Sequence, residues 1–161
     1  MCEHGETLAA GSKQTPMSLV RQEDDWGCGI AVLAMLTDRS YIEAKALVMA
    51  DPRRAGHDWS LHGLYWTDID RHLIDEGWWM QRWYSGWNLP VWPPTPFADR
   101  HFAQVRQPSG NSHFVAVTAN GVALDPLVNE PRRLSDWLQV DNVTGLARRA
   151  TRRCTETPTP W

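Results

Sequence analysis

The stretch that decides the fold is QEDDWGCGIAVLAML, residues 22–36. From Cys28 to Leu36 it is continuously apolar, and Gly27 and Asp38 flank the run. An apolar run of this length with no polar position predicts a helix that is buried on most of its faces. The pattern therefore places Cys28 in the first turn of a buried helix.

Cys28 differs from the other two cysteines of the chain. Cys2 and Cys154 lie in polar terminal segments and are interpreted as incidental surface thiols. The first turn of a helix stabilises a thiolate, because its N–H groups are unpaired and the helix dipole is positive there. Gly27 and Gly29 would let the backbone approach a substrate closely, and the Cys28 N–H could face a developing oxyanion. Cys28 is therefore a candidate nucleophile, although a lone helical cysteine is more often a small core residue.

The residues just before Cys28 supply further candidates. Gln22 lies six residues earlier and could donate a second hydrogen bond to an oxyanion from its side-chain amide. Trp26 and Gly27 directly precede the cysteine and are candidate substrate-binding residues. The three acidic residues 23–25 would oppose ionisation of the thiol unless they point to solvent.

Two further helices and then a set of strands are predicted after this segment. Ser40 and Glu43 form a capping box for a second helix, whose core side is predicted at the apolar positions Ile42, Ala46, Leu47 and Met49. A third helix is predicted over residues 67–76, with Gly77 as its C-cap and with Ile69, Leu73 and Ile74 buried. Strands are predicted at 78–83, 102–106, 113–118, 122–125 and 143–147, with a short helix from Ser135 to Leu138. Helices followed by an antiparallel sheet indicate an α+β fold.

A second motif, HFVAVTANGVALDP at residues 113–126, predicts a β-hairpin. The open end of this hairpin would carry two candidate catalytic residues, His113 and Asp125. If the loop is 119–121 and its last residue is a left-handed glycine, Asp125 lies opposite Val115. Val115 shares a sheet face with His113, because side chains alternate along a strand. Asp125 and His113 then become diagonal neighbours, about 7–8 Å apart at the backbone. A two-residue loop would turn Asp125 to the other face. Taken singly, a histidine at a strand start and an Asp-Pro after a strand are more often structural.

Together the two motifs resemble papain-like cysteine peptidases. A glutamine six residues before a cysteine that heads a buried helix is their arrangement. The sequence C-G-I-A from Cys28, the sequence H-F-V-A-V from His113 and the Asp-Pro at 125–126 are similar to the branch that cleaves double-glycine leaders from bacteriocin precursors. The resemblance covers roughly residues 18–150 in element order.

The resemblance implies a papain-like fold in which the nucleophile heads a buried N-terminal helix packed on a C-terminal antiparallel sheet. It implies one domain over residues 19–152, between a polar lead-in at 1–18 and a tail at 153–161. The implied chemistry is cleavage of a peptide or isopeptide bond through a thioester, without a cofactor. The implied roles are Cys28 as nucleophile, His113 as base, Asp125 as the group that orients His113, and Gln22 as oxyanion donor.

Two other functions remain open at this stage. A catalytically silent papain-like module could serve for binding, as a bacterial or phage structural or inhibitor protein. A third reading keeps the triad but transfers the acyl group to an amine instead of water. The chain lacks a transporter segment, so leader cleavage coupled to export would need a separate protein.

Composition excludes several classes of protein. The 161 residues carry a formal net charge of −3 and are 42% hydrophobic, which excludes a wholly disordered chain and predicts no nucleic-acid partner. No signal peptide or membrane-spanning run is evident, which predicts synthesis in a reducing cytoplasm, with the virion as a further location for a phage protein. Lys13 and Lys45 are the only lysines beside many arginines, a bias that GC-rich bacterial and phage genomes produce.

Two further clusters of residues bear on function. The group His57, Asp58, His62 and His72 has no recognisable ligand spacing, and no metal site is predicted. Of the 10 tryptophans, several crowd between residues 59 and 92. We predict that the segment from Trp83 to Pro94 borders the cleft, with Trp83, Trp87 and Trp92 as candidate substrate-binding residues and an exposed tryptophan surface for a protein partner.

Overall fold

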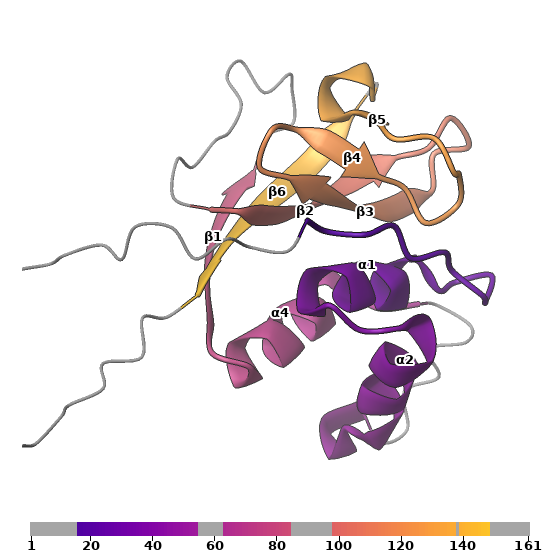
Figure 1. The fold of residues 1–161 in the computed structure, drawn as a ribbon. Coiled ribbons are helices and arrows are strands. Elements are labelled where there is room, and N and C mark those ends of the chain that lie inside the picture. The colour runs from indigo at the N-terminus through magenta and orange to yellow at the C-terminus, as the bar shows by residue number, and fades with distance from the viewer. Residues whose placement is uncertain (1–15, 55–62, 85–97, 138, 149–161) are drawn as a thin grey trace, which may run out of the picture.

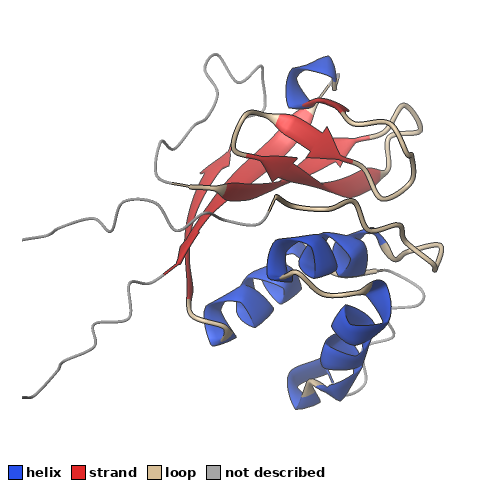
Figure 2. Ribbon diagram, viewed as in Figure 1, coloured by secondary structure: helices blue, strands red, loops and turns tan. Residues whose placement is uncertain are grey.

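The computed structural model describes residues 16–54, 63–84, 98–137 and 139–148. The helices α1, α2 and α4 lie on one side of a six-stranded antiparallel sheet, and α1 lies closest to it (Figures 1 and 2). This arrangement confirms the α+β fold class. The predicted lead-in and tail extend into residues 1–15 and 149–161, which lie outside the described residues, so the domain bounds stay a prediction.

Helix α1 (Cys28–Thr37) has the burial that its apolar sequence predicts, since every residue from 29 to 36 is buried. Asp38 ends the helix in the left-handed conformation. The buried guanidinium of Arg100 donates to the main-chain oxygen of Leu36 at 2.7 Å and to Oδ2 of Asp38 at 2.9 Å. A cation therefore neutralises the negative end of the helix dipole, while the Cys28 end faces away from it.

Helix α2 (Tyr41–Ala50) begins with the predicted capping box of Ser40 and Glu43. The predicted core side of this helix is wrong. The exposed positions are Ile42 (69% exposed), Ala46, Leu47 and Met49, whereas the buried ones are Tyr41, Ala44 and Val48. Because the helix is apolar on most sides, periodicity could not choose a face, and packing against α1 chose it.

After α2, the short 3-10 helix η1 (Pro52–Arg54) leads toward α4 (Trp66–Asp75). In α4, Ile69 and Leu73 are buried as predicted, but Ile74 is exposed. Ile74 lies about 140° around the helix axis from Ile69, which takes it off the buried face. The C-cap of the helix is Glu76 and not the predicted Gly77, which follows it with a φ of +82°.

The sheet has the strand order β1-β6-β2-β3-β4-β5. Its strands are β1 (Trp78–Tyr84), β2 (Arg100–Arg106), β3 (Ser112–Thr118), β4 (Val122–Leu124), β5 (Arg132–Arg133) and β6 (Val140–Arg148), with the 3-10 helix η2 (Leu134–Asp136) between β5 and β6. The predicted strands are all present, and β5 is an addition. The chain thus places β1 at one edge of the sheet and the β4–β5 region at the other.

The β3–β4 hairpin has the register that the sequence predicted. Ala116 pairs with Leu124, and Val117 pairs with Ala123, which leaves a three-residue loop. Gly121 closes this loop with a φ of +83°, a conformation that favours glycine. The next pair along this register sets Asp125 opposite Val115, on the sheet face that also carries His113.

Both faces of the sheet are covered. The face toward the helices contributes Phe102, Phe114, Ala116, Leu124 and Leu146 to the main core. The opposite face holds a second cluster, formed by Ala103, Val105, Val115, Val117, Ala123, Leu134, Trp137 and Val143. His113 and Asp125 therefore lie beside the second cluster, at the sheet edge formed by β4 and β5.

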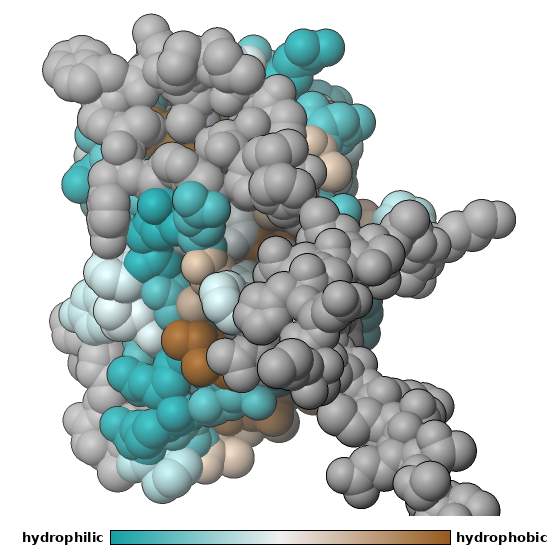
Figure 3. Space-filling view, turned by 90° about the vertical axis from the view of Figure 1, so that its left-hand side faces the viewer, coloured by the Kyte–Doolittle hydropathy of each residue, from teal (hydrophilic) through white to brown (hydrophobic). Residues whose placement is uncertain are grey.

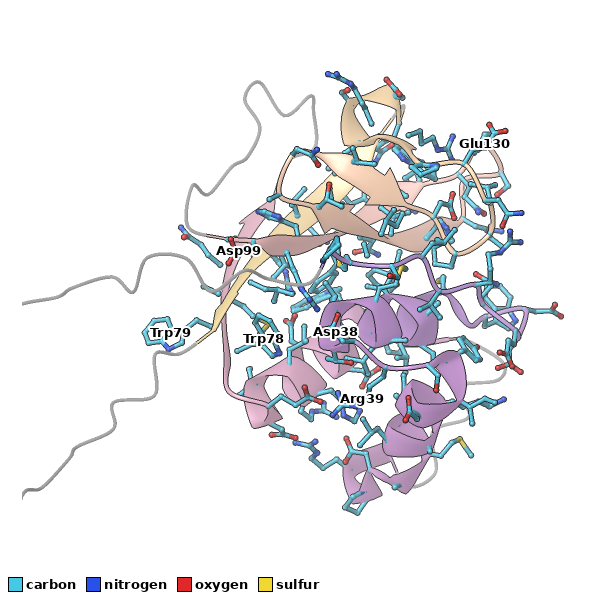
Figure 4. All side chains as sticks on the ribbon, viewed as in Figure 1. Asp38, Arg39, Trp78, Trp79, Asp99 and Glu130 are labelled. Atoms are coloured by element: carbon cyan, nitrogen blue, oxygen red, sulfur yellow. The ribbon has the colours of Figure 1, made fainter. Side chains whose placement is uncertain are left out.

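The two tryptophans at the start of β1 point in opposite directions (Figure 4). Trp78 is buried, while Trp79 is 60% exposed. On the β1 side of the molecule, the visible described surface is mainly hydrophilic and its apolar areas are small (Figure 3). Within the described ranges, no helix has the length and apolar character needed to cross a membrane.

Candidate active site

Three separate elements carry the predicted catalytic residues to one place. Cys28 is the first residue of α1, His113 is the second residue of β3, and Asp125 directly follows β4. Helix α1 packs against β3, so the head of the helix meets the start of the strand (Figure 1). The hairpin register then brings Asp125 beside His113. Residues 85 positions apart in sequence thus become neighbours through the packing of one helix on one strand.

His113 and Asp125 form a direct and buried contact. The distance between Nε2 of His113 and Oδ1 of Asp125 is 2.7 Å, and these residues are only 3% and 2% exposed. The main-chain N–H of Leu127 also donates to Oδ1 of Asp125, at 2.9 Å. Burial by itself would raise the pKa of Asp125, but the hydrogen bonds from His113, Leu127 and Arg132 hold it below its usual value. The carboxylate is therefore charged and fixed toward the imidazole.

The Cys28 thiol lies close enough to the His113 ring to affect the pKa of that ring. Burial would lower the pKa of His113, yet hydrogen bonds and charge from Asp125 and Cys28 raise it to about 9. An imidazole in this position stays protonated at neutral pH. The catalytic roles of Cys28 and His113 stay predictions.

The turn before Cys28 keeps its negative charge away from the thiol. Asp24 accepts a hydrogen bond from Tyr41 Oη at 2.7 Å, and Lys45 Nζ lies 2.9 Å from its Oδ2. The bonds from Lys45 and then Tyr41 hold the pKa of Asp24 below its usual value. Glu23 and Asp25 are exposed to solvent. The acidic run predicted to oppose ionisation therefore has one member paired with a cation and two in water.

Gly27 is required where the turn meets α2. A Cβ atom at Gly27 would lie 2.0 Å from Tyr41 Oη, the hydroxyl that binds Asp24. The head of α1 has no side-chain cap and no acidic residue in its first turn. Its N–H groups thus have no carboxylate of their own helix to bind, which leaves them suited to a developing negative charge beside Cys28.

Gln22 makes a contact that the sequence did not predict. Its Nε2 donates to the main-chain oxygens of Asp24 and Asp25, at 2.9 and 3.2 Å, while its Oε1 is buried. The main-chain N–H of Gln22 also donates to the oxygen of Pro126, 3.2 Å away. Gln22 therefore braces the turn and ties it to the loop after Asp125, and its role as an oxyanion donor stays a prediction.

Sequence reasoning missed Arg132 and Trp137, which complete the surroundings of His113. Arg132 Nη2 lies 3.2 Å from Oδ2 of Asp125, and its guanidinium carbon lies 3.8 Å from the centre of the Trp137 ring. The rings of Trp137 and His113 have their centres 6.1 Å apart. No spacing rule links these residues. Lys45 and Tyr41 could have been noticed as an i, i+4 pair that shares one helix face.

The other predicted site residues have different outcomes. Trp26 is largely exposed two residues before Cys28. Trp83 belongs to β1, with β6 and β2 between its strand and β3. Trp87 and Trp92 lie outside the described residues, as does most of the segment 83–94, so their roles in binding stay predictions. Among the described residues, no group of three or more His, Cys, Asp and Glu side chains is placed to hold a metal ion.

Comparison with known proteins shows the fold. No protein-family model and no curated protein matches the sequence. Among the solved structures similar to it are two of the peptidase domain of ComA, which the first describes as a bi-functional ABC transporter of Streptococcus involved in a quorum-sensing pathway. The first is 17% identical with a TM-score of 0.59, over 83% of this chain and 100% of that one. The second, from Streptococcus mutans and bound to a small-molecule inhibitor, is 16% identical with a TM-score of 0.52, over 81% and 98%.

The chain therefore has the papain-like cysteine peptidase fold that its two motifs predicted. The likeness is to the peptidase domain of a double-glycine leader peptidase, the branch that the C-G-I-A and H-F-V-A-V sequences resemble. At these identities the likeness concerns the fold.

Proposed function

We propose that this protein is a cysteine peptidase that cleaves a peptide or isopeptide bond through a thioester intermediate. The observation that supports the proposal most strongly is the buried contact of His113 with Asp125, together with the effect of the Cys28 thiol at the helix head on the pKa of His113. A buried histidine with a pKa near 9 beside a thiol at a helix head is what a thiolate–imidazolium pair requires.

The proposed mechanism uses these groups in turn. In the resting pair His113 already holds the proton that the Cys28 thiol has given up, and the thiolate attacks the carbonyl carbon of the scissile bond. The charge on the carbonyl oxygen is stabilised by the Cys28 N–H, with Gln22 as the second proposed donor. The C–N bond then breaks as the imidazolium gives its proton to the leaving amine. Water, deprotonated by His113, hydrolyses the thioester and frees the thiol.

The substrate class follows from this chemistry and fold: a peptide or a protein with an accessible amide bond. The exposed side chain of Trp26 beside the nucleophile offers apolar contact area for such a substrate. The formal net charge of −3 does not favour a polyanion as the substrate.

Selective alkylation tests the proposal without a known substrate. The full chain is treated with iodoacetamide at pH 6, and each cysteine is followed by mass spectrometry. Cys28 should react at least tenfold faster than Cys2 and Cys154, because a thiol of ordinary acidity is only about 0.3% ionised at that pH. Equal, slow reaction at all three positions would support the silent binding module instead.

Once a cleaved peptide is found, the acceptor can be identified directly. Adding a simple primary amine during turnover should leave the free carboxylate as the main product. A product that is mainly the amide of the added amine would instead show acyl transfer.

A further inference from the structure

Arg132 occupies a defined place beside the proposed catalytic residues. It belongs to β5, where its backbone pairs with Ala123. Its side chain is 43% exposed, but its Nη2 reaches Oδ2 of the buried Asp125 at 3.2 Å. The guanidinium lies over the ring of Trp137 at 3.8 Å, a distance typical of a cation–π contact.

The carboxylate of Asp125 therefore lies between two basic groups. Its Oδ1 binds Nε2 of His113 and the N–H of Leu127, and its Oδ2 binds Arg132. Because Arg132 is always charged, it draws on the same negative charge that stabilises the imidazolium. A single carboxylate shared by two cations stabilises each of them less than it would stabilise one alone.

Trp137 holds this arrangement in place. Its ring is buried, with one contact to the guanidinium of Arg132 and another to the ring of His113, whose plane is tilted by 35° from its own. The stacking limits the positions that an otherwise half-exposed arginine can take. Arg132 is thus fixed near the acidic member of the site although its outer part meets solvent.

We propose that Arg132 is a positioning residue that, through Asp125, weakens the hold of His113 on its proton. The inference rests on the proposed function, since it concerns the proton that His113 must return to the leaving amine. A histidine that holds its proton too firmly is a poor general acid. Because Asp125 is shared with Arg132, it stabilises the protonated ring of His113 less, and the ring gives up its proton more readily.

The other charged groups around His113 do not offer the same control. The titratable group of α1 that lies beside His113 is Cys28 itself. The one on the loop after β4 is Asp125. Among the neighbouring elements, Arg106 of β2 binds Asp141 of β6 at 2.8 Å, and the carboxylate of Asp136 accepts from the N–H of Arg133. Arg21 is bound to the oxygens of Leu127 and Asn129. Only Arg132, among the arginines described here, has an ion pair with Asp125.

The test is an NMR titration of His113 in the full chain, with the imidazole signals labelled and that of His113 identified by its loss in His113→Gln. In Arg132→Met the titration midpoint should move up by about 0.3 to 1 pH unit, because one of the two cations is gone. Arg133→Met is the matched control, since it removes the same charge from the next residue of the same strand, and its midpoint should stay within 0.1 unit of the wild type, roughly the change expected from a screened surface charge. Arg132→Lys should move the midpoint by less than half as much as Arg132→Met, because the positive charge remains.

The outcomes separate this inference from the proposed function. If wild-type His113 titrates above pH 8 and Cys28 is alkylated selectively at pH 6, but Arg132→Met matches Arg133→Met, this inference alone is wrong. The same holds if Arg132→Lys shifts the midpoint as far as Arg132→Met. If wild-type Cys28 reacts no faster than the other cysteines, the proposed function fails and this inference fails with it.

Discussion

His101 and His113 lie on the neighbouring strands β2 and β3, on the same face of the sheet, and both are buried. Burial lowers the pKa of His101 to about 4. Burial also acts to lower the pKa of His113, but Asp125 and Cys28 raise it to about 9. The cross-strand partners of His101 are Val117 and Gly145, which offer no charge.

The contrast separates the effect of burial on a histidine pKa from the effect of a neighbouring carboxylate. The sheet gives both histidines the same dry surroundings, which favour the neutral ring. What makes one of them a candidate acid–base residue is the carboxylate that the hairpin register sets beside it. Burial alone therefore does not mark a functional histidine in this fold, and a paired carboxylate and thiol do.

Removing each ring in turn should give the largest difference between the two. His113→Ala should lower the rate of Cys28 alkylation at pH 6 by about 10²-fold, because the variant lacks the base that takes the proton of the thiol. His101→Leu, which keeps a buried side chain of similar size, should leave that rate within a factor of two, roughly the variation of unrelated core changes. Equal losses in both variants would mean that the histidines support folding and not the thiol.

The carboxylate should account for part of that effect. Asp125→Asn keeps the shape of the side chain but removes its charge, so the midpoint of His113 should fall by about 1 to 2 pH units and alkylation at pH 6 by about tenfold. The measurement is the NMR titration of His113 together with the alkylation rate. An unchanged midpoint would assign the raised pKa to Cys28 alone.

Stability should depend on pH in opposite senses for the two residues. The raised pKa of His113 contributes stability below pH 6.5, and this contribution is lost as the pH rises through about 9. The lowered pKa of His101 contributes stability above pH 6.5, which is lost as the pH falls through about 4.

Urea unfolding of the wild type and of each variant tests this. Between pH 6.5 and 9.5, the wild type should lose at least about 1 kcal/mol more than His113→Gln. Between pH 6.5 and 4, it should lose more than His101→Leu by a similar amount. Parallel curves for wild type and variant on either side would mean that other groups carry the dependence there.

The smallest effect is expected from charge outside the sheet. Lys45→Met leaves Asp24 with only Tyr41 as partner, so negative charge near the head of α1 is less balanced and alkylation of Cys28 at pH 6 should slow by about two- to threefold. Arg39→Met is the control, because Arg39 pairs with Glu76 just past the far end of α1. A change of tenfold or more in Lys45→Met would show that the Asp24 turn, and not the sheet pair, governs the thiol.

The parts that the sequence predicted well depend on short-range rules. The buried helix from Cys28 follows from an unbroken apolar run. The contact of His113 with Asp125 follows from the alternation of side chains and from a glycine at 121 that closes a three-residue loop. Both rules act within about a dozen residues, so no knowledge of the tertiary structure was needed.

The parts that failed depend on packing between distant segments. The core face of α2 was predicted wrongly, because the helix is apolar nearly all round and its orientation is set by α1 and by the bond of Tyr41 to Asp24. Arg132 and Trp137 meet Asp125 and His113 through loops whose course no pattern in the sequence specifies. The contacts of the Gln22 amide with the carbonyls of Asp24 and Asp25 also depend on the backbone course of the turn, which no pattern specifies, while its role as an oxyanion donor stays a prediction.

The loop between β3 and β4 determines how the proposed site would respond to the loss of a codon. Asp125 and His113 share a face because Val117 pairs with Ala123 across the loop, and the length of that loop can change without breaking this pairing. Loss of a single codon within 119–121 would keep the two side chains together if a two-residue turn closed the same strand pairs. The same loss would carry the side chain of Asp125 to the helix-facing side of the sheet if Val122 were drawn into the loop, because the pairing would then slip by one residue.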